Sequence, residues 1–351
     1  MRGKGITYDT GFRSAGTTTH EPFDPEIVRR EMRIIHDDLR CNAVRVTGAY
    51  PERLELAAKY AAEAGLEVWF CPFTNGLTIE ELLSLLADCA ERAERLRQRG
   101  AEVVFLTGSE VSVCTLGFLP GDRLEDRLAL LAEPLRLRAL IPEMRARMNE
   151  FLGKAVEIVR VRFGGRLSYA SLPFEGTDWG RFDIISTDAC YRTAANAARF
   201  RDDIRAFVAQ GKAQGKPVAV TEFGCTTHHG AADTGASDSG RSDSIIEWDA
   251  ARPVRLKGEF TRNEDEQARY IGELLDVFQT EGVDSVFVNT FARYDLPHRA
   301  DPREDFDMAS FGVVKVLEGR HGRQYPDMMW EPKAAFTTLA DRYSSSKRTL
   351  D

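Results

Sequence analysis

The sequence contains no long apolar run and no cluster of positive charge. No stretch approaches the roughly 18 continuous apolar residues that a membrane-spanning helix requires, so we expect no membrane contact. The formal net charge is −8 and no run is rich in lysine or arginine, which argues against binding to nucleic acid. The three-glycine dinucleotide fingerprint and the phosphate-binding loop are also absent. We therefore expect a small-molecule partner and no cofactor, and the oligomeric state stays open.

Cysteine is sparse and scattered, and no CxxC pair occurs. The segment Met1–Tyr8 carries cations but no apolar core of the kind a secretory signal has. Both features are typical of a cytoplasmic protein with reduced thiols. Cys225 with His228 and His229 could form a zinc site, but the thiols are separated and no carboxylate–histidine spacing supports it. We therefore predict no metal.

Short apolar runs alternate along the chain with longer amphipathic segments. Alternation of this kind predicts parallel strands joined by right-handed helical crossovers. Nearly all the apolar runs are continuous, as in strands buried on both faces, and a count of eight favours a closed barrel over an open sheet. The expected strands are Lys4–Tyr8, Asn42–Thr47, Glu67–Cys71, Glu102–Thr107, Leu167–Leu172, Phe182–Thr187, Pro217–Thr221 and Ser285–Thr290. We predict an α/β fold, a closed (β/α)₈ barrel formed by one domain over residues 1–351.

Local signals mark the helices and loops between these strands. Asp24-Pro25 opens one helix and the capping box Thr78–Glu81 opens another. After the fourth strand we expect helices at 123–131 and 142–163, and only the link from the fifth to the sixth strand is too short for a full helix. Long loops should follow strands four, seven and eight. The loop Gly224–Thr261 is rich in Gly, Ser and Asp, and we predict that it covers the barrel mouth, seated by Ile245, Ile246 and Trp248.

Two carboxylates stand directly behind buried strands, where this fold places its catalytic groups. Glu110 follows FLTGS at the end of the fourth strand, and Glu222 follows VAVT at the end of the seventh, within TEFG. The fourth and seventh strands of an eight-stranded barrel face each other across the mouth. The two carboxylates could therefore flank one scissile bond, although each could instead be a structural partner of a barrel cation.

Further polar and aromatic residues fall at the ends of the strands and are candidates for substrate binding. Trp69 could instead be barrel packing, Glu175 could lie in a solvated loop, and Tyr191 and Asn289 could be structural. The candidates are Tyr8, Asp9, Arg45, Trp69, Ser109, Glu175, Asp188, Tyr191, Asn289 and Phe291.

With this arrangement the chain resembles the clan A glycoside hydrolases, a superfamily of (β/α)₈ barrels. In that clan the acid/base glutamate ends strand four and the nucleophile ends strand seven, as Glu110 and Glu222 would here. Arg45 in NAVRVT resembles the arginine that supports the clan's nucleophile, and Tyr191 resembles the tyrosine that hydrogen-bonds it. The chain is also similar to uncharacterised bacterial barrels that carry the label "abortive infection protein", which implies no mechanism.

Two positions depart from the clan pattern. The asparagine that precedes the acid/base residue is Ser109 here, and the strand-eight tryptophan is missing, with Phe291 as the nearest aromatic residue. The resemblance implies a retaining mechanism on a small glycoside or glycoconjugate, with an ionised Glu222 and a protonated Glu110. The alternatives are a non-hydrolytic acid/base enzyme on the same barrel, such as an isomerase or cyclase of a biosynthetic pathway, and a catalytically retired binding barrel.

Overall fold

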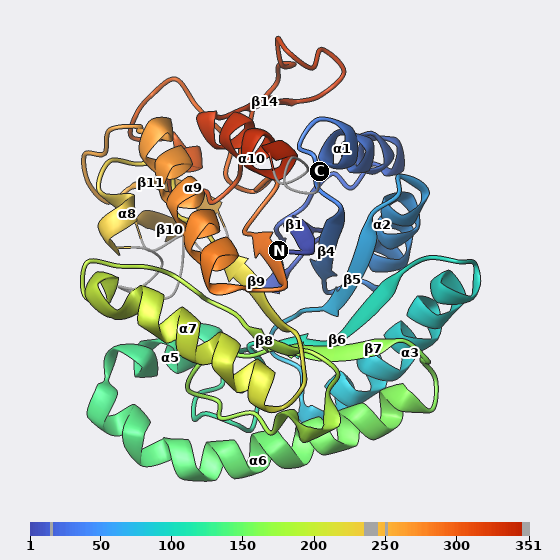
Figure 1. Ribbon diagram of the computed structural model, residues 1–351. Coiled ribbons are helices and arrows are strands. Elements are labelled where there is room, and N and C mark those ends of the chain that lie inside the picture. The colour runs from blue at the N-terminus through green and yellow to red at the C-terminus, as the bar shows by residue number, and fades with distance from the viewer. Residues whose placement is uncertain (15–16, 235–244, 250–251, 346–351) are drawn as a thin grey trace.

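A computed structural model describes residues 1–14, 17–234, 245–249 and 252–345. Eight parallel strands form a nearly closed barrel at the centre of a single domain, and helices surround it (Figure 1). The predicted fold class is confirmed. The barrel strands are β1 (Gly3–Asp9), β4 (Ala43–Gly48), β5 (Glu67–Pro72), β6 (Val103–Ser109), β7 (Arg166–Ala170), β8 (Ile185–Thr187), β9 (Val218–Phe223) and β12 (Ser285–Val288).

The barrel closes weakly between β7 and β8. All other neighbours share parallel ladders, in the order β7-β6-β5-β4-β1-β12-β9-β8. Between β7 and β8 there is one bridge, Ser171 to Thr187, with Asp188 N donating to Ser171 O at 2.8 Å. The Ser168 and Ser186 hydroxyls also pair across this seam at 2.6 Å. The link between the two strands is too short for a packed helix, which leaves this side of the barrel less covered.

The helices begin largely where the local signals predict. Asp24 accepts from Glu26 N at the start of α1, and Thr78 and Glu81 form the predicted capping box of α3. None of the helices in the described residues is long and apolar enough to span a membrane. The longer helices are α1 (Pro25–Asp37), α2 (Pro51–Glu63), α3 (Ile79–Gln98), α6 (Pro134–Arg160), α7 (Ala197–Ala213), α9 (Glu264–Glu281) and α10 (Ala334–Ser345).

One helix start differs from the prediction. The sequence predicts a helix from residue 142, but α6 begins at Pro134 and carries Pro142 in its interior. A proline here removes one amide donor, which leaves the carbonyl of Arg138 without its helical partner. Arg138 is exposed, so water can solvate that carbonyl and the helix continues. The predicted helix at 123–131 is present as α5 (Leu124–Ala129) and the 3₁₀ turn η1 (Leu130–Ala132).

The inside of the barrel is filled by side chains and forms a floor under the mouth. Trp69 packs against Phe287 with ring centroids 4.8 Å apart, and its indole N–H donates to Glu67 at 2.7 Å. A larger apolar cluster lies between the strands and the helices. The interior layer consists of Ala43, Trp69, Cys71, Val104, Leu106, Ile184, Ala219 and Phe287.

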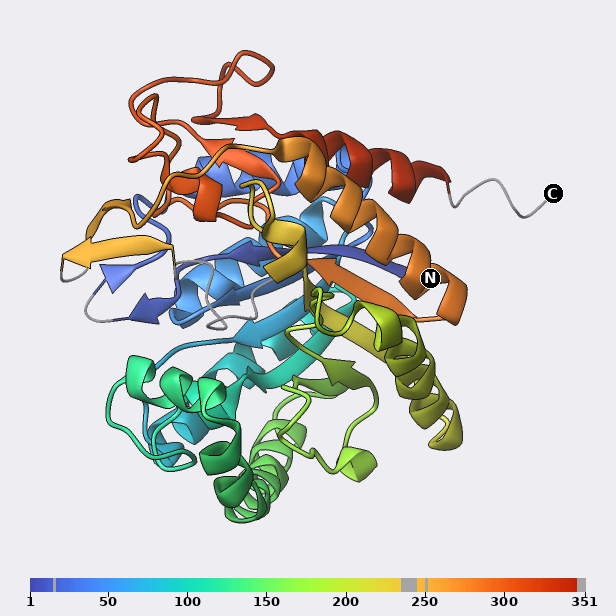
Figure 2. The ribbon, with the colours of Figure 1, turned by 90° about the vertical axis from the view of Figure 1, so that its left-hand side faces the viewer.

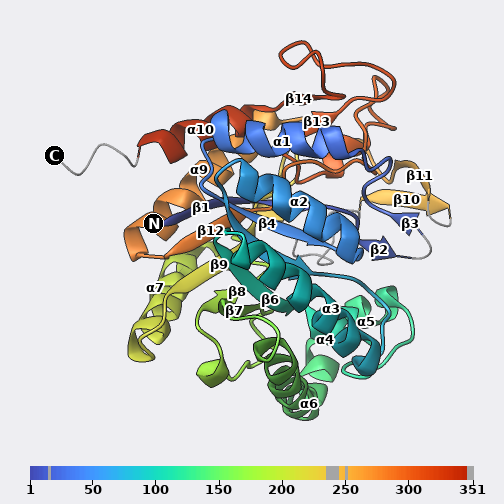
Figure 3. The same cartoon turned by 90° about the vertical axis from the view of Figure 1, so that its right-hand side faces the viewer.

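Small elements gather at the carboxyl ends of the strands. Figures 2 and 3 show the β10–β11 hairpin (Ile246–Asp249, Arg252–Leu256) and the β2–β3 pair (Arg13–Ser14, Thr17–Thr18) at this end. The remaining short elements of the described chain are α4 (Val111–Cys114), α8 (Ala231–Thr234), η3 (Phe306–Ala309), β13 (Val314–Val316) and β14 (Trp330–Pro332), together with η2 (Trp179–Arg181), which comes directly before β8.

The segment predicted to seat a lid lies at this end of the barrel. Ile246 is fully buried in a cluster with Leu256 and Phe306, and Ile245 and Trp248 pack against it. The apolar run therefore attaches the hairpin to the segment that follows β12. Residues 235–244 of the predicted lid lie outside the described residues, and the covering of the mouth stays a prediction.

Candidate active site

The two glutamates come from β6 and β9, on different sides of the barrel mouth. Glu110 follows β6 directly and caps α4, with its backbone N–H donating to Ala170 O at 3.0 Å. Glu222 is the penultimate residue of β9. The charge of Glu222 is the second-largest cause, after burial, of a raised pKa at Glu110. The fold thus brings the two predicted carboxyls into electrostatic contact.

Glu222 is held by two donors. The Tyr191 hydroxyl donates to Glu222 Oε1, and Arg45 Nη1 lies 3.6 Å from Oε2. Burial, with the charge of Asp188 second, raises the Glu222 pKa to about 7, while Arg45 and Tyr191 oppose that rise. The side chain stays 18% exposed, so an incoming molecule can reach it.

Arg45 lies beneath the carboxylates with a side chain only 1% exposed. Its guanidinium donates to both oxygens of Asp188 at 3.3 Å, to Thr221 O at 3.0 Å and to Ser109 Oγ at 2.8 Å. A buried guanidinium needs such partners because its desolvation is otherwise too costly. Arg45 and Asp188 therefore form a neutral, rigid base for the site.

Ser109 belongs to this base and does not face the mouth. Its hydroxyl accepts from Arg45 and donates to Asp188 Oδ2 at 2.6 Å, so both its roles are taken. Asp188 also accepts from Thr221 Oγ1 at 2.8 Å and is fully buried. Both residues were candidates for substrate binding, and the structure places both below the carboxyls of Glu110 and Glu222.

Glu110 has a different environment from Glu222. In the described part of the chain its carboxyl has no hydrogen-bond partner. Burial, then the charges of Glu222, Asp188 and Glu175, raise its pKa well above the ordinary value, and the charge of Arg45 opposes them. When the pair holds one proton, that proton therefore resides on Glu110 and the charge on Glu222.

Two further candidates stand at strand ends near the mouth. Asp9 ends β1, where its carboxylate accepts from Gly11 N at 2.8 Å and from the Thr19 hydroxyl. Asn289 follows β12. Its backbone N–H donates to the carbonyl oxygen of Phe223, the residue after Glu222, at 2.8 Å. Asn289 is partly buried, and its side-chain amide makes no hydrogen bond within the described residues.

None of the remaining candidates hydrogen-bonds to either carboxyl, and only Glu175 is close enough for its charge to act on Glu110. Tyr8 donates to Glu31 of α1 at 2.5 Å, outside the barrel, and Phe291 packs on Tyr8 with centroids 6.1 Å apart. Trp69 belongs to the interior floor. Glu175 is fully buried rather than solvated and accepts from the backbone of α4.

Sequence reasoning missed two polar residues of this region. Thr221 donates to Asp188, and Tyr169 of β7 accepts from Val111 N at 2.9 Å, next to Glu110. Thr221 directly precedes Glu222, and Tyr169 lies in the predicted fifth strand. Both are polar residues in otherwise apolar runs, which is the signal that would have found them.

The residues of the alternative zinc site do not converge. Cys225 is fully buried, whereas the His229 side chain is 77% exposed and pairs with Glu266 at 3.3 Å. Within the part of the chain that is described, no group of three or more His, Cys, Asp or Glu side chains is arranged to hold a metal ion.

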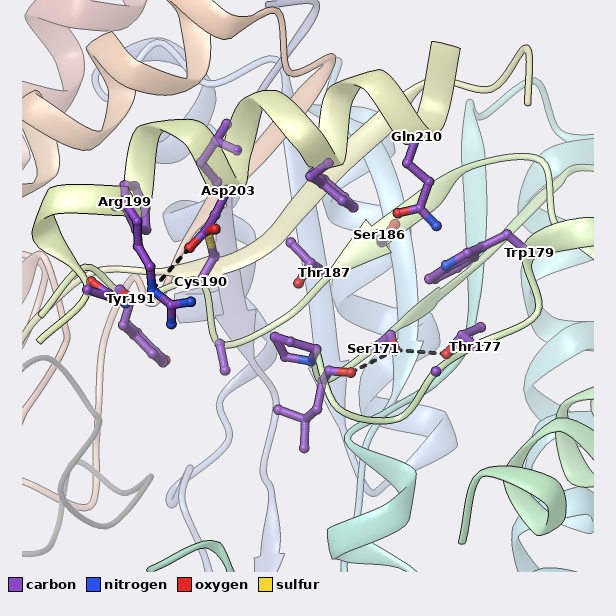
Figure 4. Close-up of a pocket in the computed structure, with 18 residues that line it drawn as sticks. Ser171, Thr177, Trp179, Ser186, Thr187, Cys190, Tyr191, Arg199, Asp203 and Gln210 are labelled. Carbon is purple, nitrogen blue, oxygen red and sulfur yellow. Dashed lines mark hydrogen bonds and ion pairs between the residues drawn. The ribbon is translucent and has the colours of Figure 1, made fainter. Parts of the chain in front are cut away.

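A separate cavity lies beside β8, outside the barrel. Its volume is about 520 Å³, and it lies between α7 and the segment that joins β7 to β8 (Figure 4). Tyr191 lies at one end of it, and Trp179 and Gln210 lie toward the other. It occupies the side of the barrel that lacks a packed helix.

Comparison with known proteins defines the fold. No family model and no curated protein matches the chain. A GH113 β-mannanase from Alicyclobacillus acidocaldarius, in complex with ManMIm, superposes with a TM-score of 0.58 at 16% identity, covering 98% of this chain and 97% of that one. A β-glucuronidase from Parabacteroides merdae gives 0.53 at 16% identity, covering 98% of this chain but only 36% of that one. At this identity the likeness confirms a barrel of the glycoside hydrolase type as the fold alone.

Proposed function

We propose that the protein is a glycoside hydrolase-like enzyme that uses Glu222 as nucleophile and Glu110 as general acid and base. One observation carries the proposal: two neighbouring carboxyls at the strand ends have opposite surroundings. Glu222 is held by Arg45 and Tyr191, whereas the Glu110 carboxyl has no hydrogen-bond partner among the described residues and a strongly raised pKa. Pairs of titratable groups with separated pKa values are typical of acid/base catalysis.

In the first step the Glu222 carboxylate attacks the anomeric carbon and displaces the leaving group. Glu110 donates its proton to the departing glycosidic oxygen, so that an alcohol leaves. Arg45 and Tyr191 fix the orientation of the Glu222 carboxylate by contacts to its two oxygens. A retaining enzyme of this type needs carboxyls roughly 5–5.5 Å apart.

In the second step water resolves the glycosyl ester. Esterification removes the charge of Glu222, the second-largest cause that raises the Glu110 pKa. Glu110 is already ionised, because it gave its proton to the leaving group. It takes a proton from water while the water oxygen attacks the anomeric carbon from the face that the leaving group occupied, and the bond between that carbon and Glu222 breaks. The product keeps its configuration, and both carboxyls return to their starting states.

The charge around the site favours a neutral sugar. Asp188, Glu175, Glu110 and Glu222 interact there, and among the causes of the Glu110 pKa shift the only cation is Arg45, whose guanidinium lies beneath the mouth. An anionic substituent near the anomeric carbon would meet repulsion. We therefore propose that the substrate is an uncharged small glycoside or glycoconjugate. We also propose that the reaction takes place in the cytoplasm and needs no metal or cofactor.

Aryl glycosides of different leaving-group ability test this assignment. On a panel of neutral 2,4-dinitrophenyl and phenyl β-glycosides, E222Q should lose turnover on both, because an amide is not a nucleophile. E110Q should lose turnover mainly on the phenyl glycosides, whose leaving group needs a proton. The account is wrong if both variants keep wild-type turnover on a glycoside that the wild type cleaves.

A second candidate is a non-hydrolytic acid/base enzyme, such as an isomerase or cyclase. The observation in its favour is Ser109, which stands where the clan has an asparagine and whose hydroxyl already accepts from Arg45 and donates its proton to Asp188. On that account turnover of the true substrate depends on Glu222 as a base and survives E110Q.

A further inference from the structure

The backbone at Glu110 adopts a conformation that needs support. Its φ angle is +48°, in the left-handed region, which residues with a side chain rarely adopt. Such a conformation is strained and persists only where neighbouring groups enforce it. The backbone conformation at Glu110 sets the direction in which its side chain leaves the chain.

Tyr169 contacts the chain at the next residue. Its hydroxyl accepts from the backbone N–H of Val111 at 2.9 Å and lies 2.9 Å from both oxygens of Glu175, to which it donates. The tyrosine is fully buried in β7, the strand adjacent to β6. The first amide after Glu110 is therefore tied to a rigid part of the barrel.

Glu175 holds the second amide after Glu110. Its Oε1 accepts from Ser112 N at 3.1 Å, and its Oε2 accepts from Leu172 N at 2.8 Å and Ser171 Oγ at 3.2 Å. Every partner is a donor, so the site is built for a carboxylate that only accepts. The segment after β7 and the first turn of α4 are thereby joined through one buried side chain.

We propose that Tyr169 and Glu175 are positioning residues that hold the backbone after Glu110 and so aim its carboxyl at Glu222. The inference rests on the proposed function, in which Glu110 is the general acid. The two side chains fix consecutive amides, Val111 and Ser112, from the strand next to β6 and the loop behind it. Without them the turn at Glu110 can relax and the carboxyl can rotate toward water.

The electrostatics agree with this geometry. The charge of Glu175 is among the causes that raise the pKa of Glu110, and the charge of Glu110 is among those that raise the pKa of Tyr169. The three groups are therefore within electrostatic reach of one another. A Glu110 carboxyl that turned away would lose both the burial and the repulsion, and its pKa would fall.

The test compares Y169F with a matched control, Y343F. Tyr343 is also buried and its hydroxyl donates to Gly5 O at 2.9 Å, but it lies between α10 and β1, away from the two glutamates. The first readout needs no substrate: the pKa of Glu110 is measured by carbon-13 NMR of glutamate carboxyls, with E110Q assigning the signal. The second is the ratio of kcat on phenyl and 2,4-dinitrophenyl β-glycosides.

In Y169F we expect the Glu110 pKa to fall by about one unit and kcat on the phenyl glycoside to drop roughly tenfold more than on the dinitrophenyl one. Y343F should leave both unchanged. Equal changes in the two variants, or an unchanged Glu110 pKa in folded Y169F, overturn the proposal. If Y169F does not fold, S171A, which removes one donor to Glu175, should lower the pKa by a smaller amount, and no fall there overturns the proposal.

The two readouts separate this inference from the proposed function. If no aryl glycoside is hydrolysed by the wild type but the Glu110 pKa still falls in Y169F, the positioning role stands and the assigned reaction fails. If aryl glycosides are cleaved with the expected dependence on Glu110 and Y169F changes neither readout, only the positioning role fails.

Discussion

Glu110 and Glu222 carry the same carboxyl group among different partners. Tyr191 and Arg45 stabilise charge on Glu222, while no group in the described residues donates a hydrogen bond to the Glu110 carboxyl. Hydrogen bonds to a charged form favour that form, and burial disfavours it. The assignment of roles rests on this difference between the two environments.

Removal of the Tyr191 hydroxyl should shift the acid limb of the activity profile. Tyr191 lowers the pKa of Glu222, which stands at about 7. In Y191F that pKa rises, so Glu222 stays protonated to higher pH and the acid limb moves up by about one unit. The check is kcat/KM against pH. Y294F is the control, because Tyr294 donates to a different buried carboxylate, Glu31, and it should leave the limb in place.

Substitution of Glu110 by glutamine should stabilise the protein at high pH. The folded state raises the pKa of Glu110, so the folded protein holds a proton that the unfolded chain releases above its ordinary pKa. Stability from this group is complete below the unfolded value and is lost as pH rises toward the folded one. E110Q should therefore gain about 1 kcal/mol at pH 8 and nothing at pH 3, by urea unfolding.

E175Q is the matched control for that measurement. Glu175 faces only donors, so an amide in its place presents N–H to N–H and must lose stability. A gain in E175Q, or a loss in E110Q at high pH, would contradict the electrostatic account of this site.

The sequence predicts which residues have functional side chains better than it predicts where those side chains point. Glu110, Glu222, Arg45 and Tyr191 could be named because a charge or hydroxyl at a strand end is conspicuous. Tyr8 and Phe291 were grouped with them, yet both pack outside the barrel. In strands buried on both faces the apolar run is continuous, so the sequence does not reveal which side chains point inward.

At the scale of elements, ion pairs join the segments that follow β9 and β12. Arg262, just before α9, pairs with Asp305 at 2.7 Å and Asp307 at 2.9 Å, both next to or within η3. Lys333 is fully buried and pairs with Asp307 at 2.9 Å. These contacts connect the chain after β9, the strand that contains Glu222, with the chain after its neighbour β12.

R262A should destabilise the protein by about 3 kcal/mol, because it removes the guanidinium that two nearly buried carboxylates share. Asp307 keeps its pair with Lys333, and Asp305 keeps its contact with His298. The side chains of Asp305 and Asp307 are only 6% and 1% exposed. The measurement is the unfolding free energy in urea. K154A removes a solvent-exposed pair with Glu150 and should change nothing measurable. A loss in R262A no larger than in K154A would show that the cluster does not hold these segments.

Elements without strong periodicity escaped prediction. The β10–β11 hairpin places Ile246 opposite Leu256, while Glu247 and Arg255 form an ion pair at the surface. One apolar pair in a short hairpin gives too little pattern to detect. The early start of α6 escaped as well, since a proline in a helix interior ordinarily marks a boundary and here it does not.

At the scale of the whole molecule, the barrel explains why the two glutamates meet. They are separated by more than a hundred positions in the sequence, and parallel strands bring their carboxyl ends to one mouth (Figure 1). The eight strands could be predicted because each is a distinct apolar run. The short link between β7 and β8 could be predicted as well, but the cavity beside it could not, since the cavity follows from how short β8 is and from the side chains that line it.

Trapping of the covalent intermediate tests the central claim most directly. A neutral 2-deoxy-2-fluoro glycoside with a 2,4-dinitrophenyl leaving group slows the second step more than the first, so the glycosyl enzyme should accumulate. Mass spectrometry should then find the added fluorosugar on the peptide that contains Glu222, and E222Q should stay unlabelled. Labelling of another residue, or turnover of the parent glycoside with no adduct at Glu222, would contradict the account.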